Sequence, residues 1–89
     1  MSDFDIPPEL RMNYIARRKS DLEKCKSAVQ QNDFETLYSI GHQIKGNAST
    51  FGYDELALIA IDLEKFAHLK DVQKLDHILI RMAEFLSKM

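Results

Sequence analysis

Residues 34–52 read FETLYSIGHQIKGNASTFG, and this stretch decides the fold class. Its apolar residues recur at spacings of three and four, which is the period of an amphipathic α-helix. Asn32 precedes the stretch as a candidate N-cap, Glu35 would complete a capping box, and Gly52 is a natural C-terminal stop. The stretch therefore predicts a helix with one buried side. That side comprises Phe34, Leu37, Tyr38, Gly41, Ile44, Ala48 and Phe51.

The same period continues on both sides of this stretch, and no segment alternates in hydrophobicity as a strand would. A preceding helix is expected from about Pro8 to Gln31, because proline suits the first turn of a helix. Two more helices follow, and Asp71 is placed to cap the last one. The apolar residues of these three helices are Leu10, Tyr14, Ile15, Leu22, Cys25 and Val29, then Leu56, Ile59, Ala60, Leu63, Phe66 and Ala67, and finally Val72, Leu75, Leu79, Met82, Phe85 and Leu86.

Short connections between amphipathic helices place consecutive helices side by side and antiparallel. The sequence therefore predicts an all-α fold, an antiparallel up-down-up-down four-helix bundle with a short N-terminal arm. Phe4 and Ile6 in that arm are expected to fold back over one end of the bundle. No stretch has the composition of an interdomain linker, so residues 1–89 are expected to form a single domain.

The composition narrows the class of protein. The chain has 89 residues, of which 45% are apolar, with 12 basic and 14 acidic residues and a net charge of -2. This near balance argues against a nucleic-acid binder and gives no reason to expect a membrane surface. The longest apolar run, residues 56–61, is too short to span a bilayer, and the N-terminus lacks the pattern of a signal peptide. With Cys25 as the only cysteine, these features predict a soluble protein of the reducing cytoplasm.

Two glycines lie inside the helix of residues 34–51, where each costs about 1 kcal/mol relative to alanine. Gly41 lies on the apolar side, where a missing side chain lets a neighbouring helix pack closely. Gly46 lies off that side, one turn beyond His42. We expect Gly46 to leave the imidazole of His42 open to an incoming group. Lys45 and Ser49 share the same side of the helix, where an ammonium and a hydroxyl suit a phosphoryl group on that imidazole.

The pattern His-x-x-Lys-Gly on a helix, followed by a turn rich in small residues and a second glycine, resembles the signature of histidine phosphotransfer (Hpt) domains. The resemblance runs from about Glu9 to Leu86. It implies that His42 is the phosphoacceptor, Lys45 a phosphoryl-stabilising residue and Gly46 its small neighbour. It also implies a response-regulator receiver domain, or a hybrid histidine kinase that carries one, as the partner. The following helix matches the family through Leu56, Ala57, Ala60, Leu63 and Glu64.

Glu64 is indicated by two routes. The resemblance implies a glutamine or glutamate at this position that hydrogen-bonds the imidazole. Independently, Ala57, Ile61, Glu64 and His68 form one stripe on their helix, rotated off its core side. Antiparallel packing would place this stripe beside His42. We expect Nδ1–H of the ring to donate to Glu64, which leaves Nε2 as the nucleophile. On the same stripe His68 is a candidate supporting residue, and Ile61 and Ala57 are candidates for docking the receiver.

The sequence thus predicts a phosphoryl carrier without autonomous catalysis. We expect no resident cofactor, because no glycine-rich phosphate loop is present and Mg²⁺ should come with the receiver. Glu64 and His68 supply only half of a metal site. His77 and the basic run of residues 17–19 are most simply solvated helix faces. Two alternatives stay open: a phosphorylation-independent helical adaptor, and the phosphoacceptor domain of a larger sensor or chemotaxis-type histidine kinase.

Overall fold

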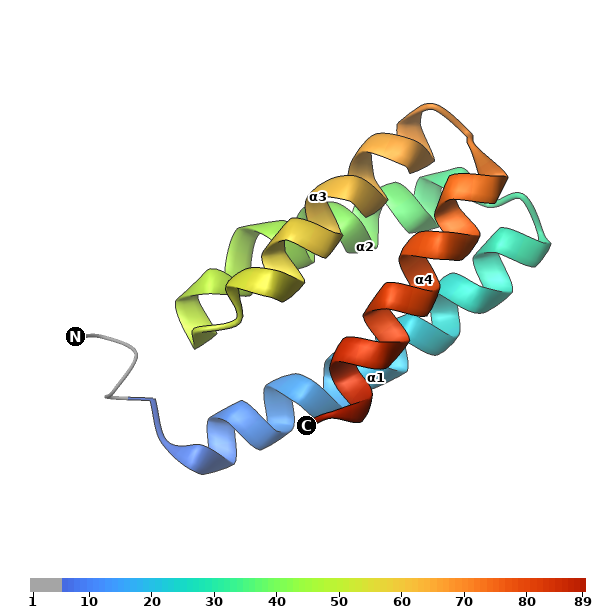
Figure 1. The fold of residues 1–89 in the computed structure, drawn as a ribbon. Coiled ribbons are helices and arrows are strands. Elements are labelled where there is room, and N and C mark those ends of the chain that lie inside the picture. Colours follow the sequence, from blue (N-terminus) through green and yellow to red (C-terminus); the bar gives the residue numbers. More distant parts are fainter. Residues whose placement is uncertain (1–5) are drawn as a thin grey trace.

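The computed structural model describes residues 6–89 and shows a bundle of helices (Figure 1). In the described part of the chain they are α1 (Pro8–Gln30), α2 (Phe34–Asn47), α3 (Asp54–His68) and α4 (Val72–Ser87). A short 3₁₀ turn, η2 (Ser49–Phe51), joins α2 to α3. Consecutive helices run in opposite directions, and no strand occurs within residues 6–89. The predicted up-down-up-down bundle is confirmed. Of the N-terminal arm, Phe4 lies outside the described residues and Ile6 is half-buried.

The predicted starts of the first and last helices are confirmed, whereas both predicted ends of the second helix differ in the structure. Asp71 caps α4 by accepting a hydrogen bond from the backbone N–H of Lys74 at 3.1 Å. Gly52 has φ 86°, a left-handed conformation that glycine adopts without strain, but it ends the 3₁₀ turn η2, whereas α2 itself ends at Asn47 and not at Phe51 as predicted. The N-cap of α2, however, is Asp33, which accepts from the N–H of Thr36 at 3.2 Å.

Asn32 was predicted to be that cap, but it lies in the turn at the C-terminal end of the preceding helix. It adopts φ 54°, which asparagine tolerates better than most residues, and it lies in the turn that ends α1. The following N–H, that of Asp33, donates back to the carbonyl of Ala28 at 2.8 Å. The chain therefore enters α2 one residue later than expected, and Glu35 is not positioned to complete a capping box.

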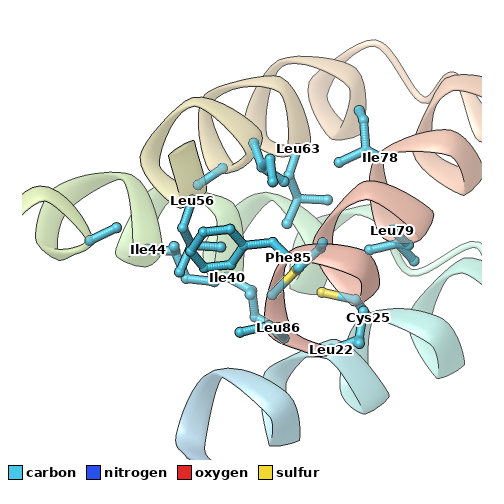
Figure 2. Packing of buried hydrophobic residues seen from close by; sticks show 14 of the residues in the cluster. Leu22, Cys25, Ile40, Ile44, Leu56, Leu63, Ile78, Leu79, Phe85 and Leu86 are labelled. Atoms are coloured by element: carbon cyan, nitrogen blue, oxygen red, sulfur yellow. The ribbon is translucent and has the colours of Figure 1, made fainter. Parts of the chain in front are cut away.

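The four helices enclose one apolar core, part of which is shown in Figure 2. Most residues of the predicted apolar sides are buried in it. Leu10, Tyr38 and Val72 were expected to be buried, but their exposed fractions are 52%, 42% and 38%. Ile40 and Ile78 take up core positions that the sequence analysis did not assign. Helical spacing shows on which side of a helix a residue lies. How much of that side is buried depends on how the neighbouring helices pack against it.

Cys25 belongs to this core and is fully buried. Burial raises the pKa of its thiol to about 12, so the side chain stays neutral and packs as a small apolar group. Within residues 6–89, no helix combines the length and the apolar character that crossing a bilayer requires.

Gly41 lets α2 and α3 pack closely against each other. A Cβ atom at position 41 would lie 2.8 Å from the backbone N of Glu64 and 3.1 Å from the carbonyl O of Ala60. Backbone atoms of a helix cannot move aside cheaply, so only glycine allows this approach. Because Gly41 directly precedes His42, the same close approach brings Glu64 beside the imidazole.

Candidate functional site

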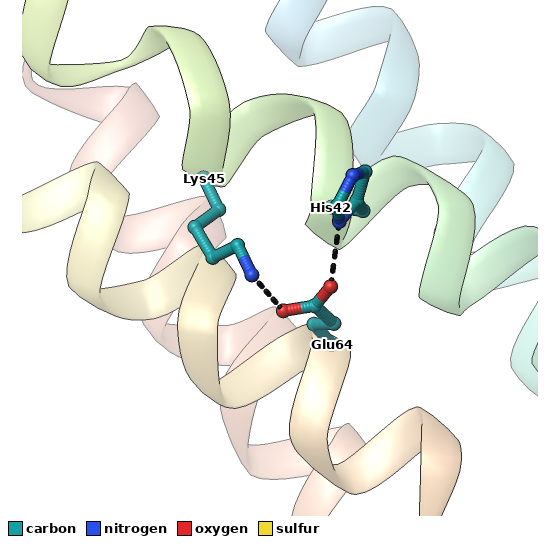
Figure 3. A network of polar contacts seen from close by, with 3 residues as sticks. All are labelled: His42, Lys45 and Glu64. Atoms are coloured by element: carbon teal, nitrogen blue, oxygen red, sulfur yellow. Dashed lines mark hydrogen bonds and ion pairs between the residues drawn. The ribbon is translucent and has the colours of Figure 1, made fainter.

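A carboxylate from α3 holds two side chains of α2 (Figure 3). Oε2 of Glu64 lies 2.7 Å from Nδ1 of His42, and Oε1 of Glu64 accepts a hydrogen bond from Nζ of Lys45 at 2.6 Å. The side chain of Glu64 is 13% exposed, that of Lys45 37% and that of His42 63%. The carboxylate is thus set back between the helices, and the imidazole projects toward solvent.

These contacts determine the protonation of the cluster. The ammonium of Lys45, and next the imidazole of His42, hydrogen-bond Glu64 and lower the pKa of its carboxyl. Glu64 is therefore ionised at neutral pH and can only accept, so Nδ1 of His42 carries the proton in this contact. In the neutral ring the lone pair is then on Nε2, and that nitrogen points away from Glu64 (Figure 3).

Gly46 lies one turn after His42 and leaves this face of α2 open. No atom lies within 4 Å of the place where a Cβ at position 46 would be. This is the opposite of the situation at Gly41, although both glycines are in the same helix. The prediction that Gly46 is exposed beside His42 is confirmed, and packing does not account for its small size.

Tyr38 belongs to the surroundings of His42, which the sequence analysis did not anticipate. Its ring lies nearly parallel to the imidazole, with the centroids 6.2 Å apart and an interplanar angle of 6°. The ring of His68 is also near Tyr38, with the centroids 6.4 Å apart, but the two rings are tilted by 55°. His68 thus reaches the edge of the site through Tyr38. The available signal was that Tyr38 precedes His42 by four residues, which places both on one side of a helix.

The structure places the other predicted site residues in different surroundings. Ser49 lies in η2, after the end of α2, so the helical spacing that related it to His42 does not extend to it. Ile61 is 43% exposed on α3, one turn before Glu64. Ala57 is only 8% exposed and packs in the core, so it offers a partner little surface. The expectation that Ala57 contributes to docking is therefore not carried forward, and Ile61 is.

A hollow of about 750 Å³ opens on the other side of α2, between α1 and α2. His42, Gln43 and Gly46 line it from α2. The other lining residues are Leu10, Asn13, Tyr14, Arg17, Arg18, Asn47 and Phe51. Two arginines and no carboxylate are among them. No group of three or more His, Cys, Asp or Glu side chains within the described part of the chain is arranged to hold a metal ion.

The helical fold agrees with the comparison to known families. The family model described as the Hpt domain matches residues 9–87, nearly the whole chain. Comparisons with curated proteins and with solved structures gave no match. Hpt domains are phosphocarrier modules of phosphorelays and interact with the receiver domains of response regulators. From the extent of the match and the helical architecture, the chain belongs to the Hpt domain family.

Proposed function

We propose that this Hpt domain accepts a phosphoryl group on Nε2 of His42 and exchanges it with an aspartate of a receiver domain. The observation that carries the proposal is the 2.7 Å contact between Nδ1 of His42 and Glu64. It orients the ring and puts the reactive lone pair on the exposed nitrogen. The lowered pKa of Glu64 keeps the acceptor ionised for this task.

The transfer step follows from this arrangement. The lone pair of Nε2 attacks the phosphorus of the receiver's phospho-aspartate, the N–P bond forms, and the P–O bond to the aspartate breaks. The aspartate leaves as a carboxylate. The proton on Nδ1 stays in place, so the ring becomes positively charged, and the carboxylate of Glu64 stabilises that charge. In the reverse step the N–P bond breaks and the ring leaves as a neutral imidazole.

Lys45 supports the site through Glu64. Its ammonium holds one carboxylate oxygen at 2.6 Å while His42 holds the other, so Glu64 is fixed from both sides. This contact directs Lys45 toward α3, and we assign it the role of orienting Glu64 and of lowering the negative potential near a phosphoryl group on the ring. Ser49 and His68 are assigned no contact with the phosphoryl group.

Docking is assigned to the surface around the imidazole. Ile61 on α3 and Tyr38 on α2 are both apolar in large part and exposed, at 43% and 42%. Burying them would give a receiver an apolar anchor on each side of the carboxylate. We place the Mg²⁺ of the reaction on the receiver, since both oxygens of Glu64 are already engaged. The same chemistry would serve if the domain is part of a larger histidine kinase.

The test is transfer from a receiver carrying labelled phospho-aspartate. The wild-type protein should acquire an acid-labile, base-stable label, whereas His42→Gln should acquire none and keep its helical circular dichroism spectrum. Its fold should survive because the His42 side chain is 63% exposed and leaves no cavity. His77→Gln, on exposed α4 surface, is the matched control and should be labelled normally. Label on His42→Gln would refute the assignment, and an unlabelled wild type would favour the helical adaptor.

A further inference from the structure

The hollow between α1 and α2 has a basic lining beside the exposed side of the imidazole. Tyr14 stiffens its wall, because its ring stacks on Phe51 at 4.2 Å and its hydroxyl donates to Oδ1 of Asn47 at 2.5 Å. Both of these contacts tie α1 to the segment that ends α2. The position of the α1 side chains relative to His42 is therefore set by packing.

The two arginines of the hollow differ in what they already bind. Arg18 is ion-paired with Asp21 at 2.9 Å, its guanidinium lies 4.6 Å from the centroid of Tyr14, and its side chain is only 12% exposed. Arg18 is thus held in the lining of the hollow by contacts within the protein. Arg17 is exposed, and its side chain makes no ion pair or hydrogen bond within residues 6–89. Its positive charge is available to a ligand.

The basic side chains near His42 lie on two sides of it, Lys45 toward α3 and Arg17 toward α1. Lys45 is directed toward α3, where Glu64 engages it at 2.6 Å. Nε2 of His42 points away from that carboxylate (Figure 3). His42 also lines the hollow. Gly46 lines it too and places no side chain between the imidazole and α1. Arg17 on α1 is therefore the cation that remains available to a charged group on Nε2.

We propose that Arg17 binds the phosphoryl group carried by His42, with the hollow between α1 and α2 as the site of its oxygens. This inference rests on the proposed function. A guanidinium presents several N–H donors in one plane and pairs well with phosphoryl oxygens. Arg17 forms no covalent bond and takes no proton. It stabilises the charge of the group that moves from the donor to Nε2, and the bonds made and broken are those given above.

The experiment uses phosphoramidate as a small phosphoryl donor, so that no receiver surface is involved. The rate of phosphohistidine formation is measured for wild type, Arg17→Ala and Arg17→Lys. An exposed cation contributes modestly, so Arg17→Ala should be slower by roughly two- to fivefold and Arg17→Lys should recover much of the loss. Lys24→Ala is the matched control, because Lys24 is an exposed cation on α1 outside the hollow, and it should equal wild type.

A second arm uses a phosphorylated receiver over a range of concentrations. The defect of Arg17→Ala should persist when the receiver is saturating. A defect confined to low receiver concentration, with normal phosphorylation by phosphoramidate, would show that Arg17 binds the partner's surface and would overturn the proposal. Normal behaviour of Arg17→Ala in both arms would overturn it too, while leaving the role of His42 intact. A wild type that neither donor phosphorylates would overturn the proposed function itself.

Discussion

At the scale of single residues, the account depends on one carboxylate with two partners. Glu64 accepts from Lys45 and from His42, and both hydrogen bonds are stronger when the carboxylate is ionised. The ion pair with Lys45 gives Glu64 a stabilising role in the fold, and the contact with Nδ1 gives it a role in the chemistry. The pH dependence of the free energy of unfolding measures the first of these roles.

The pH dependence has a defined sign. The pKa of Glu64 is lower in the folded chain than its ordinary value of 4.5, chiefly because of Lys45. Its contribution to stability is therefore complete above pH 4.5 and is lost as the pH falls through the lowered pKa. The free energy of unfolding of Glu64→Gln should be lower than that of wild type by about 1 kcal/mol or less at pH 7, because the ion pair is partly exposed.

Urea denaturation of both proteins between pH 7 and pH 3 measures this difference. It should shrink as the pH falls below the ordinary pKa of a glutamate. Glu84→Gln is the control, since Glu84 is an exposed carboxylate on α4 and should show no such convergence. A gap between wild type and Glu64→Gln that stays constant with pH would mean that the variant loses packing and that charge is not the cause.

The cluster of His42, Lys45 and Glu64 shows which parts of the site can be predicted from the sequence. His42, Lys45 and Gly46 share one helix, so their spacing placed them together, and the family resemblance pointed to Glu64 on the next helix. The direction of Lys45 was not accessible, because it depends on the distance between α2 and α3. Tyr38 was assigned to the core, since spacing alone does not show that its sector of α2 is uncovered.

At the scale of helices, α2 has two glycines with opposite environments. A methyl group at position 41 would meet the backbone of α3 at 2.8 Å, whereas one at position 46 would meet nothing within 4 Å. The two positions share a helix and the same change of residue. They therefore form a pair of substitutions that differ chiefly in packing.

Gly41→Ala and Gly46→Ala should shift stability in opposite directions. Alanine gains about 1 kcal/mol of helix propensity at either site, but crowding at position 41 costs about 1–3 kcal/mol. Gly46→Ala should therefore be more stable by up to about 1 kcal/mol, and Gly41→Ala less stable by up to about 2 kcal/mol. Thermal unfolding of the three proteins checks this. A Gly41→Ala protein as stable as Gly46→Ala would show that α3 gives way and that Gly41 does not set the helix separation.

The ends of the helices illustrate a second limit of sequence analysis. Asn32 and Asp33 are both good N-cap residues, so spacing and composition cannot rank them. The choice is made by the turn that ends α1, in which residue 32 takes φ 54° and Asp33 is left to cap α2. Asp71 had no such competitor as an N-cap, and its prediction was confirmed.

At the scale of the whole molecule, the bundle gives His42 two different sides. Toward α3 the ring contacts the carboxylate of Glu64, which also binds Lys45. Toward α1 it borders a hollow lined by Arg17, whose charge has no partner within residues 6–89. The four-helix fold was predictable because each helix has a clear apolar side. The hollow was not, since it depends on how α1 lies against α2. Residues 17–19 therefore looked like an ordinary solvated face, although Arg17 and Arg18 differ in their surroundings.

The central claim is that Glu64 holds Nδ1 of His42 and leaves Nε2 to take the phosphoryl group. Long-range proton–nitrogen NMR of the ¹⁵N-labelled protein after phosphorylation identifies the ring nitrogen that is bonded to phosphorus. We expect a single phosphohistidine at residue 42, with phosphorus on Nε2 and a proton on Nδ1. Phosphorus on Nδ1 of His42, or on the ring of His68 or His77, would contradict the account.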